Sequence, residues 1–312
     1  MKEQASAREL ILQCGDGLGN QMFKYAAGLF FAQRTGYSLR VLSPLLQHQQ
    51  WSGYPRPFQL SQFQLQNEIG PPSSVDRVFL ANRPRMRVAA SLLGGVLRRR
   101  AIQEPQPYRF SPALLDGNRS VALYLNGYWQ SAGYVAGAAE ALRERYRFRT
   151  PPTGRNAEYA RLIQALACPV SVHLRVGDYA TIRNKDSIGG TASMVLRREY
   201  YTTAIERLQQ ELPGSTLIVF SDDLTKAREI LVDQPGCVFA EGNDAATAYE
   251  DLRLMSLCRH HIIANSSFSW WGAWLNCGAE KRVFAPKYWS NTRESYFPEL
   301  YPAGWTVVDN LA

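Results

Sequence analysis

The sequence predicts an α/β protein with two Rossmann-like domains. The chain has 312 residues, which is enough for two domains with a core each. After residue 151, short apolar runs alternate with segments of helical length, a pattern typical of a parallel sheet with helices on both faces. A strand, a glycine loop and a helix open the chain in a similar way. We therefore expect domains over residues 1–150 and 151–312, joined at Pro151-Pro152-Thr153-Gly154 and facing a cleft.

The composition is that of a globular protein without disulfides. It is 46% hydrophobic and 20% charged, and its five cysteines are far apart with no Cys-x-x-Cys pair, which favours reduced thiols. Residues 1–8 lack the apolar core of a signal peptide, and no stretch approaches ~18 continuous apolar residues, so we expect a cytoplasmic location. The net charge of +8 suits a nucleic acid, an anionic membrane or a phosphorylated substrate, and does not choose among them.

The opening strand, loop and helix are suited to binding an anion. We expect a strand over Leu10–Cys14, a tight loop over Gly15–Gly19 and a helix over Asn20–Gln33. Such a unit aims free backbone N–H groups at an anion. The glycine spacing differs from the dinucleotide fingerprint G-x-G-x-x-G, and no acidic residue ends the next strand, Leu39–Leu42, which disfavours a nicotinamide or flavin enzyme.

A basic segment lies in the region 45–108, whose elements the sequence does not define. Arginines surround the apolar run Val88–Leu97, and Glu104 is the only acid of residues 77–109. The segment Arg83–Arg100 has two interpretations: contact with the anionic inner leaflet of a membrane, or a solvated helix with its apolar face against the core. Nucleic-acid binding is disfavoured, because no recognised nucleic-acid module accompanies the arginines.

A cluster of aromatic and amide side chains follows the predicted strand Val121–Leu125. Trp129 and Gln130 are candidates for binding a sugar, since an aromatic ring stacks on the apolar face of a pyranose and an amide pairs with its hydroxyls. Core packing of Trp129 is an equally good interpretation. A helix is expected over Ala136–Tyr146.

The second half alternates regularly between strands and helices. The expected strands are Cys168–Arg175, Thr216–Phe220, Cys237–Ala240, His261–Ala264 and Val283–Ala285, and the expected helices are Arg197–Leu212, Leu224–Val232, Ala245–Cys258 and Trp270–Cys277. In open α/β sheets, ligands bind just past the carboxyl ends of the strands. The strand ends at His173, Asp222 and Asn265 therefore predict a binding site.

These strand ends carry chemistry suited to a nucleoside diphosphate. Arg175 offers a planar fork of donors to a phosphate, or is a surface arginine paired with Asp178. Asp222 accepts hydrogen bonds from a guanine edge or a ribose, or caps the next helix. Ser266 and Ser267 at a helix start make a phosphate seat, and the three tryptophans behind them are better explained as core.

The sequence contains no recognisable metal site. It has no Asp-x-Asp, and its four histidines show no metal-ligand spacing. A leaving diphosphate would then be stabilised by Arg175 and by helix N-termini, without magnesium.

Five motifs, in order over nearly the whole chain, resemble those of the α1,2-fucosyltransferase family, glycosyltransferase family 11. They are GLGNQMFKYA at 17–26, GYWQS at 127–131, HLRVGDY at 173–179, FSDD at 220–223 and NSSFSWWGAWLN at 265–276. Two positions depart from the family pattern, which often has a second arginine in place of Val176 and a glycine in place of Asp16.

The resemblance implies a glycosyltransferase B fold and an inverting transfer of L-fucose from GDP-β-L-fucose. The acceptor would be the 2-hydroxyl of a terminal β-galactose, in an oligosaccharide or lipid-linked glycan of O-antigen type, and no metal or cofactor would be required. The first domain would bind the acceptor and the second the donor. Transfer from another GDP-sugar, a different fucosyl linkage and a non-catalytic sugar-binding module remain as alternatives.

The resemblance also implies roles for single residues. Arg175 would neutralise the leaving β-phosphate, Asn20 would position donor and acceptor, and Asp178 would take the acceptor proton or pair with Arg175. The expected donor contacts are Gly17, Gly19, His173, Asp222, Ser266, Ser267 and Phe268, and the expected acceptor contacts are Trp129 and Gln130.

Overall fold

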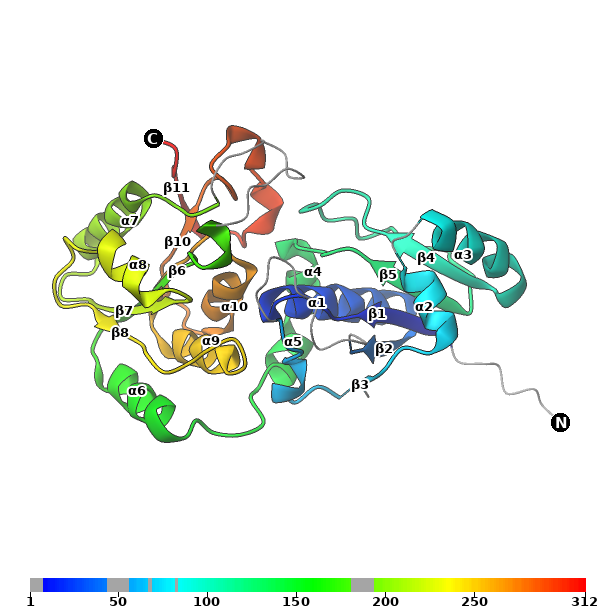
Figure 1. Cartoon of the computed structure of the whole chain (residues 1–312), viewed down its shortest axis with the longest axis horizontal. Coiled ribbons are helices and arrows are strands. Elements are labelled where there is room, and N and C mark those ends of the chain that lie inside the picture. Colours follow the sequence, from blue (N-terminus) through cyan, green and yellow to red (C-terminus); the bar gives the residue numbers. More distant parts are fainter. Residues whose placement is uncertain (1–7, 44–55, 67–68, 82–83, 181–193) are drawn as a thin grey trace. The chain divides into compact units, whose positions relative to one another are not determined.

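The computed structural model describes residues 8–43, 56–66, 69–81, 84–180 and 194–312. The chain divides into a first unit, residues 1–49 with 57–147, and a second unit, residues 50–56 with 148–312. The division after Arg147 falls near the predicted linker. Each unit holds a parallel sheet with helices packed on it (Figure 1), which confirms the predicted α/β class with two Rossmann-like domains.

The sheet of the first unit is built around β1 (Glu9–Gln13). Its strand order is β3-β2-β1-β5-β4, and all neighbouring strands are parallel. The other strands are β2 (Ser38–Leu42), β3 (Ile69–Gly70), β4 (Arg99–Gln103) and β5 (Ala122–Asn126). Leu10, Ile11 and Leu12 are at most 1% exposed, as expected for a central strand that is covered on both faces.

Two groups of helices pack on this sheet. One group is α1 (Leu18–Thr35), α4 (Ala132–Gly137) and α5 (Ala139–Arg145), and the other is α2 (Ser74–Leu80) and α3 (Pro84–Leu97), which contact each other and β4. Helix α1 ends at Gly36, whose left-handed φ of 72° favours glycine. The prediction of one helix over 136–146 is wrong, because α4 and α5 meet at Ala138, whose φ of −122° is not helical.

The sheet of the second unit is built around β6 (Pro169–Leu174), of which every residue is buried. Its strand order is β11-β10-β9-β6-β7-β8, again parallel throughout. The other strands are β7 (Thr216–Ser221), β8 (Val238–Phe239), β9 (His260–Ile262), β10 (Val283–Pro286) and β11 (Thr306–Val308). The five predicted strands are confirmed with shifted ends, and β11 is an addition to them.

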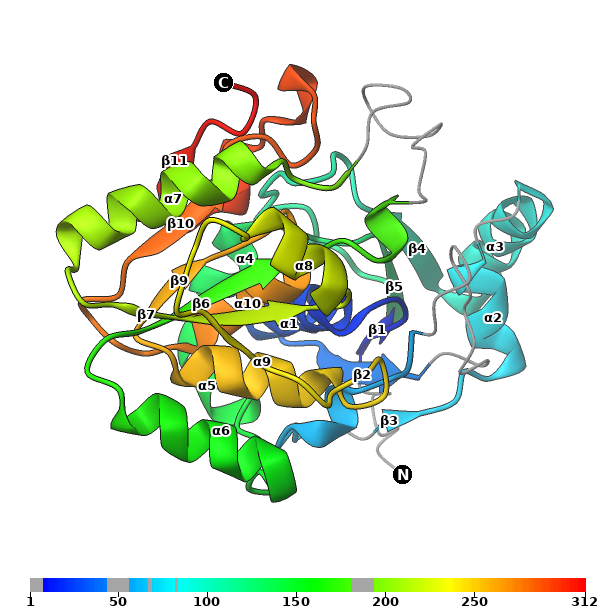
Figure 2. The same ribbon diagram turned by 60° about the vertical axis from the view of Figure 1, so that its left-hand side comes forward.

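Helices lie on both faces of the second sheet. α7 (Arg198–Glu211) and α8 (Leu224–Ile230) are on one face, and α9 (Ala248–Leu257) and α10 (Ser267–Leu275) are on the other (Figure 2), as right-handed crossovers require. An additional helix, α6 (Gly154–Ala165), packs against α9. Short 3-10 turns are η1 (Leu60–Gln62), η2 (Asp178–Ala180), η3 (Arg293–Ser295) and η4 (Pro298–Leu300).

Helix α10 differs from its prediction at both ends, and it ends at Leu275 and not at Cys277. It begins at Ser267 and not at Trp270, because Ser266 caps it by accepting a hydrogen bond from the backbone N–H of Phe268. Trp270 and Trp271 are fully buried and Trp274 is 7% exposed. The interpretation of the three tryptophans as core is confirmed.

Candidate active site

The three strand ends singled out in the sequence meet at one edge of the second sheet. β9, β6 and β7 are neighbours in the parallel sheet, so their carboxyl ends lie side by side. Arg175 directly follows β6, Asp222 directly follows β7, and Asn265 and Ser266 lie between β9 and α10. The topology therefore brings together the predicted phosphate, nucleoside and helix-start residues.

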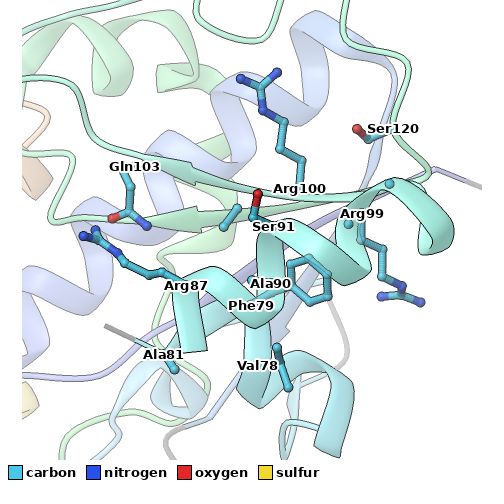
Figure 3. Close-up of a pocket in the computed structure, with 13 residues that line it drawn as sticks. Val78, Phe79, Ala81, Arg87, Ala90, Ser91, Arg99, Arg100, Gln103 and Ser120 are labelled. Carbon is cyan, nitrogen blue, oxygen red and sulfur yellow. The ribbon is translucent and has the colours of Figure 1, made fainter. Parts of the chain in front are cut away.

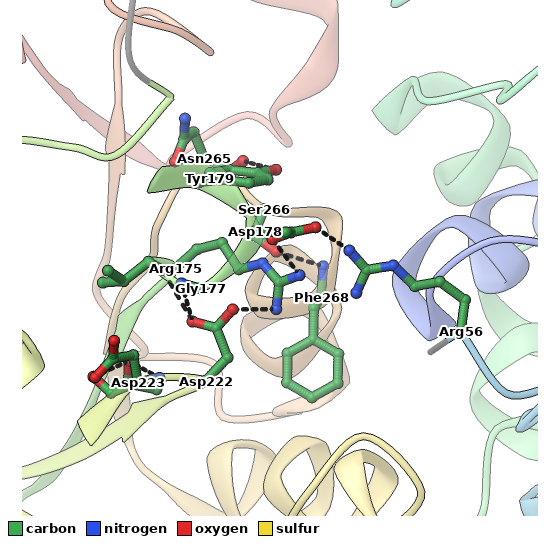
Figure 4. A network of polar contacts seen from close by, with 12 residues as sticks. Arg56, Arg175, Gly177, Asp178, Tyr179, Asp222, Asp223, Asn265, Ser266 and Phe268 are labelled. Atoms are coloured by element: carbon green, nitrogen blue, oxygen red, sulfur yellow. Dashed lines mark hydrogen bonds and ion pairs between the residues drawn. The ribbon is translucent and has the colours of Figure 1, made fainter. Parts of the chain in front are cut away.

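Arg175 is fixed in place by two carboxylates. Its Nη2 lies 2.6 Å from Oδ1 of Asp178 and its Nη1 lies 2.7 Å from Oδ2 of Asp222 (Figure 4). The guanidinium also lies 5.5 Å from the ring centre of Tyr179. Burial works against its charge, but Asp222 and Asp178 outweigh burial and raise the pKa of Arg175 above its usual value. The guanidinium is therefore a permanent, oriented cation at the sheet edge.

Asp222 orients both Arg175 and the loop that follows β6. Its Oδ1 accepts hydrogen bonds from the backbone N–H groups of Val176, at 2.9 Å, and Gly177, at 3.2 Å. The helix-capping alternative belongs to the next residue, since Asp223 accepts from the backbone N–H of Lys226 at 3.0 Å and caps α8. If Asp222 binds the nucleoside as predicted, it must accept that hydrogen bond with a carboxylate lone pair that these contacts leave unused.

Asp178 is enclosed by cations. Its side chain is 2% exposed and forms ion pairs with Arg175 and with Arg56 (Figure 4). Its Oδ1 faces Arg175 and its Oδ2 faces Arg56, so both carboxylate oxygens are engaged by guanidinium groups. The geometry thus favours the pairing role of Asp178 over the role of base.

Arg56 is a site residue that the sequence analysis missed. It belongs to the second unit although 122 residues separate it from Asp178 in the chain. No motif surrounds it in the sequence. Only the described fold shows that it shares Asp178 with Arg175.

His173 and Phe268 form the apolar wall of this site. The two ring centres lie 5.7 Å apart, and His173 is 4% exposed. Burial, together with the positive charge of Arg175, lowers the pKa of His173 to about 3, so its imidazole is neutral at any working pH. Its Nδ1 is buried and has no hydrogen-bond partner within the described part of the chain. Ser267 and Phe268, in the first turn of α10, are half-buried.

The predicted residues of the first unit lie after β1 and β5. Gly17 caps α1, with its carbonyl accepting from the backbone N–H groups of Asn20 and Gln21, so that Gly19 falls within the first turn. Oδ1 of Asn20 accepts a hydrogen bond from Nε2 of Gln130 at 2.7 Å. The structure therefore joins two of the predicted residues, Asn20 and Gln130, directly.

Trp129 is a core residue and not an exposed platform. Trp129 is 1% exposed. Its ring packs edge-on against the rings of Phe31 and Tyr134, whose centres lie 5.8 and 6.0 Å from its own. An indole enclosed in this way has no face left for stacking on a sugar. This corrects the prediction of Trp129 as an acceptor contact in favour of the core alternative.

A second polar cluster, missed in the sequence, surrounds the loop after β5. Oε2 of Glu104 accepts from the backbone N–H of Tyr128 at 2.7 Å, and Nζ of Lys24 lies 5.1 Å from the Tyr128 ring centre. Lys24 also forms a 2.7 Å ion pair with Asp16. Burial raises the pKa of Glu104. Glu104 directly follows β4. A prediction of this strand from the sequence would have placed Glu104 at the same sheet edge as the other site residues of the first unit.

Within the residues that the structure describes, no three His, Cys, Asp or Glu side chains are grouped so that they could hold a metal ion. Among the helices described, none is both long and apolar enough to cross a membrane.

Comparisons with known proteins agree on one family. The model of "Glycosyl transferase family 11" matches residues 114–309. The chain is 29% identical over 285 residues to the Escherichia coli O-antigen biosynthesis glycosyltransferase WbnK, and the match covers 88% of this chain and 92% of WbnK. It is 27% identical over 310 residues to an Escherichia coli alpha-1,2-colitosyltransferase, covering 96% of this chain and 99% of that one.

A solved structure with the same architecture is that of a mutant of Arabidopsis thaliana FUT1 in complex with GDP. Its TM-score is 0.52 at 14% identity, with 99% of this chain and 78% of that chain covered. At such low identity the likeness concerns the fold alone, and it confirms the expected glycosyltransferase B fold.

Proposed function

The chain belongs to glycosyl transferase family 11 and is a glycosyltransferase, and from this premise we propose that it is an inverting α1,2-fucosyltransferase. The donor is GDP-β-L-fucose, and the acceptor is the 2-hydroxyl of a terminal β-galactose in a glycan of O-antigen type. The second unit binds the donor and the first unit binds the acceptor. The observation that carries the proposal is Arg175, held by Asp178 and Asp222 next to the start of α10.

The arrangement around Arg175 supports stabilisation of a leaving diphosphate. In a single displacement, the bond from fucose C1 to the β-phosphate oxygen breaks and its electron pair leaves with GDP. The acceptor oxygen forms the new bond to C1, and its proton passes to the solvent. A fixed guanidinium stabilises the developing phosphate charge best when its orientation needs no adjustment. The N-terminus of α10 adds the positive end of a helix dipole.

This stabilisation requires no metal in our proposal. Arg175 and Arg56 bring two positive charges to the site, which Asp178 and Asp222 balance in the absence of ligand. A bound diphosphate would compete with the carboxylates for the guanidinium donors. We assign Asp178 to the orientation of Arg175, because it is enclosed by cations and only 2% of its side chain is exposed.

The remaining predicted residues have secondary roles in the proposal. His173 is neutral and buried, and its Nδ1 has no hydrogen-bond partner within the described residues. It lines the donor site together with Phe268. The Asn20–Gln130 pair, at the loop with Gly17 and Gly19, positions the acceptor.

A second candidate donor is GDP-colitose, because the relative that covers nearly the whole chain is named an alpha-1,2-colitosyltransferase. Colitose is L-fucose without its 3-hydroxyl. A donor site that hydrogen-bonds this hydroxyl rejects the deoxy sugar strongly, whereas an apolar site hardly distinguishes the two. The family membership holds with either donor.

GDP release distinguishes the candidates. Each donor is offered with lactose, with Galβ1,3GalNAc and with no acceptor, in the presence of EDTA. We expect acceptor-dependent release from GDP-fucose that persists in EDTA. Release from GDP-colitose alone would replace the donor in our proposal. Release that stops on chelation and returns with added magnesium would overturn the metal-free mechanism.

A further inference from the structure

Helix α3 of the first unit exposes a row of large apolar side chains. Val88, Leu92 and Val96 follow one another at four-residue spacing and are 61%, 73% and 85% exposed. Residues at this spacing lie above one another on one face of a helix. Leu93 and Leu97 are also among the exposed large hydrophobic residues of the described chain. Single exposed apolar side chains are ordinary, but a contiguous row marks an interaction surface.

The opposite face of α3, not the row, packs on the protein. Ala90 is 7% exposed and belongs to the core cluster with Phe79 and Tyr124. A Cβ added at Gly94 would lie 2.7 Å from the backbone oxygen of Arg99, so the helix approaches β4 closely at this point. Small residues of α3 therefore face the core, and Val88, Leu92 and Val96 face outward. The interpretation of this segment as a helix with its apolar face against the core is wrong for these three large side chains.

The exposed row is flanked by positive charge. Residues 77–103 contain seven arginines and no Asp or Glu. Arg85 near the start of α3, and Arg98 and Arg100 beyond its end, are exposed. No carboxylate of this segment offsets them. The face of α3 thus combines apolar side chains in the middle with guanidinium groups at both ends.

The arginines next to α3 do not form a pocket for a single anion. A cavity of about 460 Å³ lies under the helix, lined by Arg87, Arg99 and Arg100 among others. In Figure 3, Arg87 extends towards Gln103, while Arg100 and Arg99 point away from it in opposite directions. Groups that bind one phosphate would have to converge on it. This cavity is therefore not a phosphate site, and the charge next to the exposed row is that of Arg85 and Arg98.

We propose that α3 is a membrane-contact helix that lies flat on an anionic lipid surface. Val88, Leu92 and Val96 enter the boundary between headgroups and acyl chains, and Arg85 and Arg98 contact the lipid phosphates. A second copy of the chain fits this face poorly, because two α3 faces would bring like charges together. The proposal goes beyond the proposed function and does not depend on the identity of the donor.

Vesicle flotation tests this proposal with the full-length protein. Vesicles of phosphatidylcholine alone are compared with vesicles containing phosphatidylglycerol, at low and at high salt. The variants are Leu92→Glu with Val96→Glu, and Arg85→Glu with Arg98→Glu. The matched controls are Leu162→Glu with Val232→Glu, which replace apolar residues of the second unit that are 40% and 64% exposed, and Arg207→Glu, which replaces an exposed arginine of α7.

We expect the wild-type protein to bind only the phosphatidylglycerol vesicles and to detach at high salt. Both α3 variants should bind at least ~10-fold more weakly, while the controls bind as the wild type does. Unchanged thermal unfolding and unchanged turnover of a water-soluble acceptor would show that the variants are intact. Absence of wild-type binding, or equal loss in the controls, would overturn the proposal. So would concentration-dependent self-association that only the α3 variants abolish.

Discussion

Arg175 is the residue on which the proposed chemistry depends most. Replacing it with Ala removes the oriented cation and leaves Asp178 and Asp222 facing the leaving phosphate. We expect kcat to fall ~10²-fold, equivalent to roughly 3 kcal/mol of transition-state stabilisation. Steady-state kinetics with saturating donor measures this loss. Arg207→Ala, a change of an exposed arginine on α7, is the control. Turnover within about twofold of the wild type would remove Arg175 from the mechanism.

Asp178→Asn separates the two roles that the sequence left open for this residue. If Asp178 orients Arg175, the variant should lose turnover at every pH, but the acid limb of the pH profile should stay where it is. A general base, by contrast, creates the acid limb by its own titration. Disappearance of that limb in Asp178→Asn would restore the base assignment.

Two buried histidines make stability depend on pH. The folded-state pKa of His173 is about 3, and burial also holds the pKa of His261 well below 6.5. Below pH 6.5 the unfolded chain therefore binds protons that the folded chain does not, and stability falls as pH falls. From pH 7.5 to 5, His173 should account for about 2 kcal/mol of this loss.

Urea unfolding at the two pH values measures this contribution. His173→Gln cannot titrate, so its free energy of unfolding should depend less on pH by about that amount. An identical pH dependence in the variant and the wild type would mean that folding leaves the pKa of His173 unchanged, which would contradict this account.

At the scale of elements, Gly127 fixes the loop between β5 and α4. Its φ is +148°, and an added Cβ would lie 2.4 Å from Cβ of Glu104. Gly127→Ala should therefore cost about 1–3 kcal/mol of stability and displace the Asn20–Gln130 pair. Gly70→Ala, where no atom lies within 4 Å of the added Cβ, is the control. Equal melting temperatures for the two variants would contradict this account of the loop.

The sequence predicted those elements whose hydrophobic pattern is strong. β6 and the strand-helix alternation after it follow from apolar runs that are buried on both faces. The region 45–108 gave no such pattern, because β3 has two residues and α3 turns its large apolar side chains outward. Helix α6 was missed because it starts at Gly154, inside a Pro-rich segment that resembles a linker. Local patterns cannot reveal an element whose burial is set by tertiary contacts.

The same limit applies to the candidate site. Arg175, Asp222 and Ser266 follow predicted strands, so topology alone brought them together. Arg56 reaches Asp178 from a distant part of the chain, and no local pattern marks it. Trp129 was ambiguous because the packing of its ring against Phe31 and Tyr134 is a tertiary contact that cannot be read from the sequence.

For the whole molecule, the central claim is that a two-unit glycosyltransferase transfers fucose to the galactose 2-hydroxyl with inversion and without metal. The most direct test is to incubate the protein with GDP-β-L-fucose and lactose in EDTA and to determine the product linkage by NMR. We predict an α-L-fucosyl residue on O2 of galactose. A β-linked product, another linkage, or product formed only when magnesium is restored would contradict the account.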